Sequence, residues 1–234
     1  MPSQKVQLVN DEIYHIVLRS VGDTKIFLDE NDYYRGIFCL YEFNNKKLIE
    51  IRKRREERRK EKASGCRTPA DSRDLLVEVL CFSLMPNHIH LLLRQLKDNG
   101  ISHFMRKVGG GYANYFNKKY KRKGHLFNQF KAIHIKTNEQ LQNVFMYIHA
   151  NRISIIEPGW KEKGIKNPKK VMEFLKKDKW HSFSDYIGKK AFPSVTVRGF
   201  LSEVMGGEDG CKQAIKNYVK YKENFKIFSD IILE

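Results

Sequence analysis

The order of hydrophobic patterns along the chain predicts an α+β fold, a ferredoxin-like sandwich of helices packed against a central antiparallel sheet. Four segments alternate between apolar and polar residues, or are rich in β-branched and aromatic residues, as strands are: 13–19, 75–85, 88–96 and 130–136. Helical periodicity appears at 29–48, after the first strand, at 100–119, after the third strand, and at 137–154, after the fourth strand. The resulting order, β-α-β-β-α-β-α, is that of a ferredoxin-like sandwich.

The first half of the chain supplies the first strand, a helix and a hairpin. The strand IYHIVLR (13–19) ends near Gly22, and the helix that begins at Asp29 is expected to continue into a basic run at 46–62. A polar loop at 63–74 separates that run from the strand LLVEVLCFSLM (75–85). The dipeptide PN then connects this strand to HIHLLLRQL, so that the two form a hairpin.

The second half begins with a helix over 100–119, which we expect the triple glycine at 109–111 to interrupt. These glycines either let the backbone approach a ligand closely or merely break the helix. A strand at 130–136 and a helix at 137–154 follow. We divide the chain into a catalytic domain, 1–158, with a basic helical insertion at about 46–73, and a basic C-terminal extension, 159–234, with short helices near 168–178 and 208–224.

The charge balance favours a polyanionic partner. Lys and Arg number 44 against 27 Asp and Glu, which leaves a formal net charge of +17. Lysine and arginine neutralise phosphates and release their counterions, so nucleic acid is a better explanation than a merely well-solvated basic surface. The four cysteines lie far apart and form no C-x-x-C pair. No apolar leader or membrane span is evident, and we expect a cytoplasmic protein.

The stretch LMPNHIHLLLRQL (84–96) places two histidines in an apolar strand. Side chains alternate along a strand, so His88 and His90 share one face. On the helix at 137–154, Leu141, Val144, Phe145, Ile148 and Ile155 form an apolar stripe, and Tyr147 and Asn151 project from neighbouring turns beside it. If this helix packs over the strand, a phenol, an amide and two imidazoles meet.

Such a set suits metal-assisted phosphodiester chemistry. Two neutral imidazoles and an amide oxygen can hold a divalent ion that polarises a phosphodiester oxygen. A tyrosine, with an unperturbed pKa near ~10, then becomes a usable nucleophile and stores the diester energy as a phosphotyrosine. The chain contains no G-x-x-x-x-G-K-[ST] loop for ATP. Zinc fits less well, because the pair of histidines lacks a cysteine or carboxylate partner.

These motifs also resemble those of a known family. LMPNHIHLLL is similar to the His-hydrophobic-His motif of HUH endonucleases, and YIHAN is similar to their single-tyrosine helix. The resemblance to single-tyrosine transposases, especially REP-associated tyrosine transposases, extends through GISHFMRKVGGGYANYFNKKYKRKGHLF (100–127), FKAIHIKTNEQL (130–141) and WHSFSDYIG (180–188). It covers most of residues 10–190.

The resemblance implies an enzyme with the HUH endonuclease fold that binds single-stranded DNA beside an imperfect hairpin. Such an enzyme cuts with Mg²⁺ or Mn²⁺, leaves a 5′-phosphotyrosine and rejoins strands. Carried over by position, Tyr147 is the nucleophile, and His88, His90 and Asn151 are the metal ligands. The implied location is the nucleoid, and both a monomer and a homodimer are open. The loop at 124–132 and Arg152, which stands where an Asn-Pro pair is common, depart from the family pattern.

Basic and aromatic residues are interleaved between 106 and 131. Such a composition suits binding to phosphates and stacking on bases. The alternative is a helix with a solvated lysine face and an aromatic core face, and both can hold at once. Tyr112, Tyr115 and Tyr120 are rivals for the nucleophile, although stacking or packing suits them better. The candidate DNA contacts are Arg106, Lys107, Tyr112, Tyr115, Lys118, Lys119, Lys121, Arg122, Lys123 and Lys131.

Two other functions stay open. A protein that binds hairpin nucleic acid without cutting would use the same basic surface, but it needs no nucleophile beside a metal. A replication initiator or relaxase would share the HUH chemistry. Those proteins usually have longer chains or paired tyrosines, whereas only Tyr147 lies on the relevant helix face here.

Overall fold

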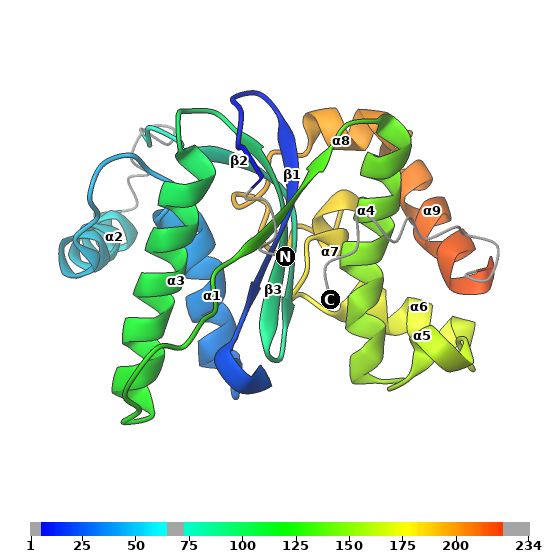
Figure 1. Cartoon of the computed structure of the whole chain (residues 1–234), viewed down its shortest axis with the longest axis horizontal. Coiled ribbons are helices and arrows are strands. Elements are labelled where there is room, and N and C mark those ends of the chain that lie inside the picture. The colour runs from blue at the N-terminus through cyan, green and yellow to red at the C-terminus, as the bar shows by residue number, and fades with distance from the viewer. Residues whose placement is uncertain (1–5, 65–72, 222–234) are drawn as a thin grey trace.

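A four-stranded antiparallel sheet with helices on both faces forms the centre of the computed structural model (Figure 1). The structure describes residues 6–64 and 73–221. The strands lie in the order β2-β3-β1-β4, and every neighbouring pair is antiparallel. This order is that of a ferredoxin-like sandwich, and the fold class predicted from the sequence is confirmed.

The observed strands agree closely with the predicted ones. The helix that begins near Asp29 does not continue into the basic run, which corrects the expectation from the sequence: it ends at Glu42, and a separate helix begins at Ile51. The strands are β1 (Ile13–Arg19), β2 (Val77–Met85), β3 (His88–Gln95) and β4 (Lys131–Ile135). The helices are α1 (Glu30–Glu42), α2 (Ile51–Ser64), α3 (Gly100–Lys119), α4 (Asn138–Ala150), α5 (Trp160–Lys163), α6 (Pro168–Lys177), α7 (Phe183–Tyr186), α8 (Gly199–Val204) and α9 (Gly207–Tyr221). Short 3-10 helices lie at Val21–Asp23 and Asn151–Ile155. No helix of the described ranges is long and apolar enough to cross a membrane.

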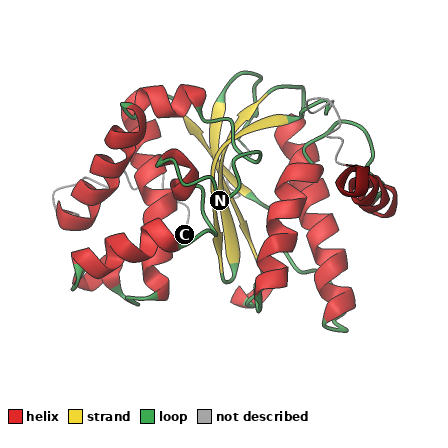
Figure 2. Cartoon of the chain, turned by 180° about the vertical axis from the view of Figure 1, so that it is seen from behind, coloured by secondary structure: helices red, strands yellow, loops and turns green. Residues whose placement is uncertain are grey.

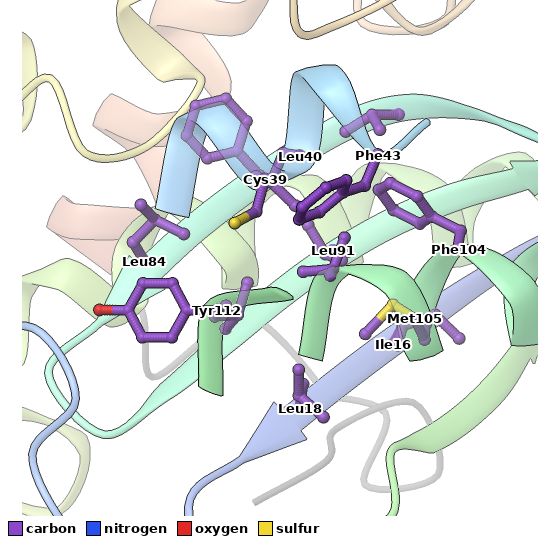
Figure 3. Close-up of a cluster of buried hydrophobic side chains, with 14 of the residues drawn as sticks. Ile16, Leu18, Cys39, Leu40, Phe43, Leu84, Leu91, Phe104, Met105 and Tyr112 are labelled. Atoms are coloured by element: carbon purple, nitrogen blue, oxygen red, sulfur yellow. The ribbon is translucent and has the colours of Figure 1, made fainter. Parts of the chain in front are cut away.

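Helices α1 and α3 cover one face of the sheet and share a hydrophobic core with it. Ile16 and Leu18 of β1 and Leu91 of β3 point into this core, where Phe104 and Tyr112 of α3 meet them (Figure 3). Asp32, which is fully buried, ties the beginning of α1 to the end of α3, because it accepts hydrogen bonds from Tyr115, Lys119 and Tyr120. The shared core therefore holds α1 and α3 together along their length, and the bonds of Asp32 join the beginning of α1 to the end of α3.

The triple glycine does not interrupt α3, which corrects the expectation from the sequence: the helix runs unbroken from Gly100 to Lys119. Its glycines make room instead. A Cβ at Gly111 would lie 2.1 Å from Cε2 of Phe43, a buried residue at the end of α1, whereas a Cβ at Gly110 would meet nothing within 4 Å. Position 111 thus allows α3 to approach α1 closely, and position 110 faces open space.

Helix α4 lies on the opposite face of the sheet, between the strands and the C-terminal helices (Figure 2). It is therefore buried on more than one side: every residue from Val144 to Ala150 is buried. Leu141, Val144, Phe145 and Ile148 are buried as predicted. Ile155, which the sequence pattern predicts on the same apolar stripe, is 40% exposed. The reason is that α4 ends at Ala150 and the chain continues as a 3-10 helix with a different period.

The C-terminal extension covers the edge of β2 as well as the outer side of α4. The backbone N–H of Leu84 donates to the carbonyl of Trp180, and that of Ser182 donates to Phe82. Further along, the N–H of Val197 donates to Val79. These bonds satisfy backbone groups that an uncovered edge strand would leave free to pair with another chain. The extension thus shares a core and a sheet edge with residues 1–158.

A buried ion pair fastens the extension beside the end of α4. Arg152 and Asp178 have side chains that are only 4% exposed, and the guanidinium of Arg152 donates both to the Asp178 carboxylate and to the backbone carbonyl of Leu84. Arg152 directly follows Asn151, and Leu84 lies at the end of β2. A single side chain therefore joins three segments around the hairpin, and this accounts for the arginine at a position where the family pattern differs.

The adjacent glycines of α3 provide a test of close packing. Gly111→Ala should lower the free energy of unfolding by about 1–3 kcal/mol, because the added methyl group overlaps the buried ring of Phe43. Gly110→Ala is the matched control and should raise that free energy by up to about 1 kcal/mol, the gain in helix propensity. Urea denaturation measures both, and equal effects would contradict the packing.

The buried ion pair provides a second test. Replacing Asp178 by alanine should destabilise the protein by about 3–5 kcal/mol, because the guanidinium of Arg152 is left buried without its partner charge. The double variant Arg152→Met, Asp178→Leu should recover much of that loss. Thermal denaturation of the single and double variants decides the matter, since purely additive losses would show that the two side chains are not coupled.

Candidate active site

Strand β3 places His88 and His90 on the face of the sheet that α4 covers. Within the sheet, His90 lies opposite Val17 and His88 lies opposite Arg19 on β1. Alternation along β3 turns Ile89 and Leu91 toward the other face, where both join the core under α1 and α3. The two imidazoles thus occupy one side of the strand because the residues around them fill the other.

The hairpin turn that precedes His88 is held by the segment after β1. The N–H of Ser20 donates to the carbonyl of Asn87 at 3.0 Å, and the N–H of Ile26 donates to that of Pro86 at 2.7 Å. The side chain of Asn87 in turn contacts Nδ1 of His88 at 2.6 Å. Backbone bonds thus fix the turn, and the turn fixes the ring at the start of β3.

Helix α4 brings Tyr147 and Asn151 to the histidines. Thr137 caps the helix by accepting from the N–H of Gln140, and Asn151 stands at its C-terminal end. Nδ2 of Asn151 lies 3.2 Å from Nε2 of His90, and the ring centroids of Tyr147 and His90 are 5.5 Å apart. The four residues that the sequence singled out, His88, His90, Tyr147 and Asn151, therefore form one cluster.

Hydrogen bonds on the far sides of the two imidazoles orient their lone pairs. The amide oxygen of Asn87 can only accept, so His88 carries its hydrogen on Nδ1 and leaves the lone pair on Nε2. Nδ1 of His90 lies 3.1 Å from Nε2 of His15. When His90 donates through this bond, its own Nε2 lone pair faces the same point as that of His88, 2.9 Å away.

This arrangement fits a divalent metal ion. Two nitrogens that bind one ion at about 2.1 Å and at right angles lie about 3 Å apart, close to the 2.9 Å between the two Nε2 atoms. Rotation of the Asn151 amide would present its oxygen to the same point. Among the described residues, no group of three or more His, Cys, Asp and Glu side chains could hold a metal, so the histidine pair would rely on this amide.

Burial keeps both imidazoles neutral, the form that binds metals. It lowers the pKa of His88 to about 3, with a further contribution from the positive charges of Arg19 and Lys161. It lowers the pKa of His90 well below its usual range, and the neighbouring His88 and His15 act in the same direction. Both residues therefore hold free lone pairs across the physiological pH range.

The Tyr147 phenol is a weak acid in its present surroundings. Burial raises the pKa of Tyr147 to about 12, although the Asn151 side chain and Arg19 act in the opposite direction. The ammonium of Lys161 lies over the Tyr147 ring, 5.2 Å from its centroid. Tyr147 therefore needs added positive charge to ionise, and Arg19 already supplies part of it.

The rival tyrosines are occupied elsewhere, and Tyr112 is not available to stack on bases as the sequence suggested. Its side chain is fully buried among α1, α3 and the sheet, and its hydroxyl donates to the carbonyl of Ile26 (Figure 3). The hydroxyls of Tyr115 and Tyr120 donate to Asp32. An aromatic ring every few residues on α3 serves the core, a role that the pattern alone does not separate from base stacking.

Several of the candidate phosphate contacts bond within the protein. Lys107 donates to the carbonyl of Lys47, which anchors the segment after α1. Lys119 pairs with Asp29 and Asp32, and Arg122 donates to the carbonyl of His125. The exposed members of the predicted set are Arg106, Lys118, Lys119, Lys121, Lys123 and Lys131.

Sequence reasoning did not assign a role to four residues that surround the cluster: His15, Arg19, Asn87 and Lys161. Of these, His15 carried a detectable signal, because it shares a strand face with Arg19 and the ferredoxin-like order makes β1 the neighbour of β3. Asn87 was visible only as a turn residue. Lys161 lies on the short helix α5, and its proximity to Tyr147 depends on how the extension packs.

Part of the sequence matches the model of a known family. Residues 68–151, which contain His88, His90, Tyr147 and Asn151, match the model of the family described as transposase IS200 like. No curated protein matches the sequence.

Among solved structures, a REP-associated tyrosine transposase bound to a REP hairpin superposes with a TM-score of 0.51 at 11% identity, covering 84% of this chain and 92% of that one. A bacterial tRNA(His) guanylyltransferase-like protein in complex with ATP gives a TM-score of 0.38 at 11% identity, with 74% of this chain and 72% of that one covered. The second score is too low to support an argument. The resemblance predicted from the sequence is confirmed: the chain is similar to IS200-like transposases over residues 68–151, and it shares its fold with a REP-associated tyrosine transposase.

Proposed function

We propose that this protein is a metal-dependent transposase that cuts and rejoins single-stranded DNA beside a hairpin, through a 5′-phosphotyrosine on Tyr147. The observation that carries the proposal is the cluster itself. Two neutral imidazoles with Nε2 atoms 2.9 Å apart face an amide and a tyrosine from one helix. Binding alone requires no such arrangement.

The histidines and Asn151 would hold a divalent ion, Mg²⁺ or Mn²⁺, which would polarise a non-bridging oxygen of the phosphodiester. The oxygen of Tyr147 attacks the phosphorus and its proton passes to water. The bond from phosphorus to the 3′ oxygen breaks, and that oxygen takes up a proton. Because the diester is exchanged for another diester, a free 3′ hydroxyl can later reverse the reaction and join the strand.

Positive charge around the cluster would bind the DNA backbone. Arg19 projects from the same sheet face as His88, opposite it on β1, and Lys161 lies over Tyr147. Lys131 begins β4 on that face, where it lies opposite Val17. The exposed lysines at the end of α3 lie toward the same end of the molecule as the hairpin turn (Figure 1). A DNA strand that follows these side chains passes the Tyr147 site.

The assay for the nucleophile is a covalent adduct on a denaturing gel. The full chain, mixed with Mn²⁺ and labelled hairpin oligonucleotides from the DNA that flanks its gene, should give a shifted band. Tyr147→Phe should abolish that band and leave hairpin binding within about twofold, because only the attacking oxygen is lost. Tyr34→Phe, on the exposed side of α1, is the matched control.

Two outcomes of this assay would overturn the proposal or part of it. Tight hairpin binding without any adduct in the unmodified protein would favour a protein that binds and does not cut. An adduct that survives in Tyr147→Phe would place the nucleophile on another tyrosine.

The metal requirement is tested by thermal stability. Mn²⁺ at a hundred times its dissociation constant should stabilise the folded chain by about 2.7 kcal/mol, since the ion binds only the native state. His88→Ala and His90→Ala should each remove this shift, whereas His103→Ala, an exposed histidine on α3, should retain it. EDTA should reverse the shift. A shift of equal size in all three variants would exclude the histidine pair as the site.

A further inference from the structure

A pocket of about 330 Å³ lies between α3 and the loop at 124–130, on the face of the sheet opposite the catalytic cluster. Leu18 of β1 lies at its base. Its walls include Arg106 and Gly110 from α3 and Phe127, Asn128 and Phe130 from the loop. The volume is at the lower end of the range of about 300–1,000 Å³ that is typical of small-molecule sites.

Gly109 and Gly110 line this space without disturbing the helix. A Cβ at Gly109 would lie 3.7 Å from Leu18 and 3.8 Å from Phe127, in ordinary contact, so a larger side chain at 109 would enter the pocket. A Cβ at Gly110 would meet nothing within 4 Å. The helix is regular at both positions. Two glycines in the middle of a helix cost stability relative to alanine, and here they leave a recess beside an aromatic loop.

The residues around the recess suit a flat ring with a polar edge. Phe127 and Phe130 are half-buried aromatic residues in the lining, and Leu18 adds an apolar side chain. The side-chain amide of Asn128 donates to the carbonyl of Ser20, which orients it, and Arg106 is exposed at the rim. Aromatic faces stack with nucleobases of any sequence, whereas amides and guanidinium groups bind their edges and the adjoining phosphate.

The pocket adjoins the catalytic cluster through the sheet. Leu18 and Arg19 are consecutive on β1 and point to opposite faces, so one faces the pocket and the other faces His88. The N–H of Asn128 donates to the carbonyl of Arg19 at 2.9 Å, which fixes the loop at this end of the strand. A DNA strand that rounds the end of β1 and the beginning of β4 can therefore reach both sites.

We propose that the pocket between α3 and the loop at 124–130 binds one unstacked nucleobase of the single-stranded DNA, a short distance along the strand from the phosphodiester at Tyr147. This inference rests on the proposed function and extends it. The base enters between Phe127 and Phe130 and rests on Leu18 in the space that Gly110 leaves. Its placement sets which phosphodiester reaches the catalytic cluster.

The experiment combines a variant that fills the pocket with cross-linking that locates the bound base. The probe is a DNA hairpin with single-stranded thymidine flanks, in which one thymine at a time is replaced by 5-iodouracil, a photoreactive base that cross-links to stacked aromatic side chains. Gly110→Leu fills the recess and keeps a good helix former. Gly199→Leu is the matched control, because a Cβ there also meets nothing within 4 Å and lies outside the pocket. Fluorescence anisotropy measures the affinity of each protein for the probe.

The expected result is a cross-link from one flank position to Phe127 or Phe130, together with a loss of affinity of about tenfold in Gly110→Leu, the size of one stacked base. Gly199→Leu should cross-link and bind like the unmodified chain. Cross-links that map only to other residues, or a Gly110→Leu variant that binds and cross-links normally, would overturn the inference.

The Tyr147 adduct, measured in the same preparations, separates this inference from the proposed function. An adduct without a cross-link in the pocket overturns the base site and leaves the cleavage activity standing. A cross-link that Gly110→Leu removes, with no adduct under any condition, supports the base site and contradicts cleavage.

Discussion

Two neutral imidazoles between a sheet and a helix, one buried and one half-buried, are the constraint on which the rest of the site depends. Burial removes the water that would stabilise their charged forms, and the positive charges of Arg19 and Lys161 lower the pKa of His88 further. The rings therefore keep lone pairs that would otherwise take up protons. The same burial raises the pKa of Tyr147, so the phenol keeps its proton, and the positive charge of a divalent cation would help it to ionise.

Keeping this cluster buried requires more than a four-stranded sandwich. Helix α4 covers the histidines on one side, and on its other side it packs against helices of the C-terminal extension. The extension is held by backbone bonds along β2 and by the pair of Arg152 and Asp178. Arg152 follows Asn151 directly and also binds the carbonyl of Leu84 beside the hairpin. The contacts that attach the extension therefore also fix the position of the Asn151 amide. A variant that loosens the extension would also move Asn151.

The fold and the centre of the site could be predicted because both depend on local periods. Alternation along a strand put His88 and His90 on one face, and the helical repeat put Tyr147 and Asn151 on neighbouring turns. Residues whose positions depend on packing between distant segments could not be predicted from these local periods. His15 contacts His90 only because β1 pairs with β3, and Lys161 reaches Tyr147 only because α5 folds back. From the sequence, Tyr147 and Asn151 formed a polar stripe beside the apolar one, but in the structure both side chains are buried.

The distribution of charge on α3 shows why composition overstates the size of a nucleic-acid interface. Lys107 and Lys119 lie in the same basic segment as Lys118 and Lys121, yet the first two bind carbonyls or carboxylates of the protein itself. A lysine that already neutralises a carboxylate releases no counterion when DNA arrives, and so adds little to affinity or to its salt dependence.

Among the candidate contacts that are exposed, Lys131 lies on the catalytic face and Arg106 lies beside the glycine-lined recess. On the catalytic face, Lys131 of β4 lies opposite Val17 of β1, and Val17 in turn lies opposite His90 of β3. Beside the recess, Arg106 is exposed at the rim. They lie on opposite sides of the sheet, so a strand in contact with both must bend around the end of β1. A flexible single strand can follow that path, whereas a rigid duplex, which resists bending over such a short length, cannot.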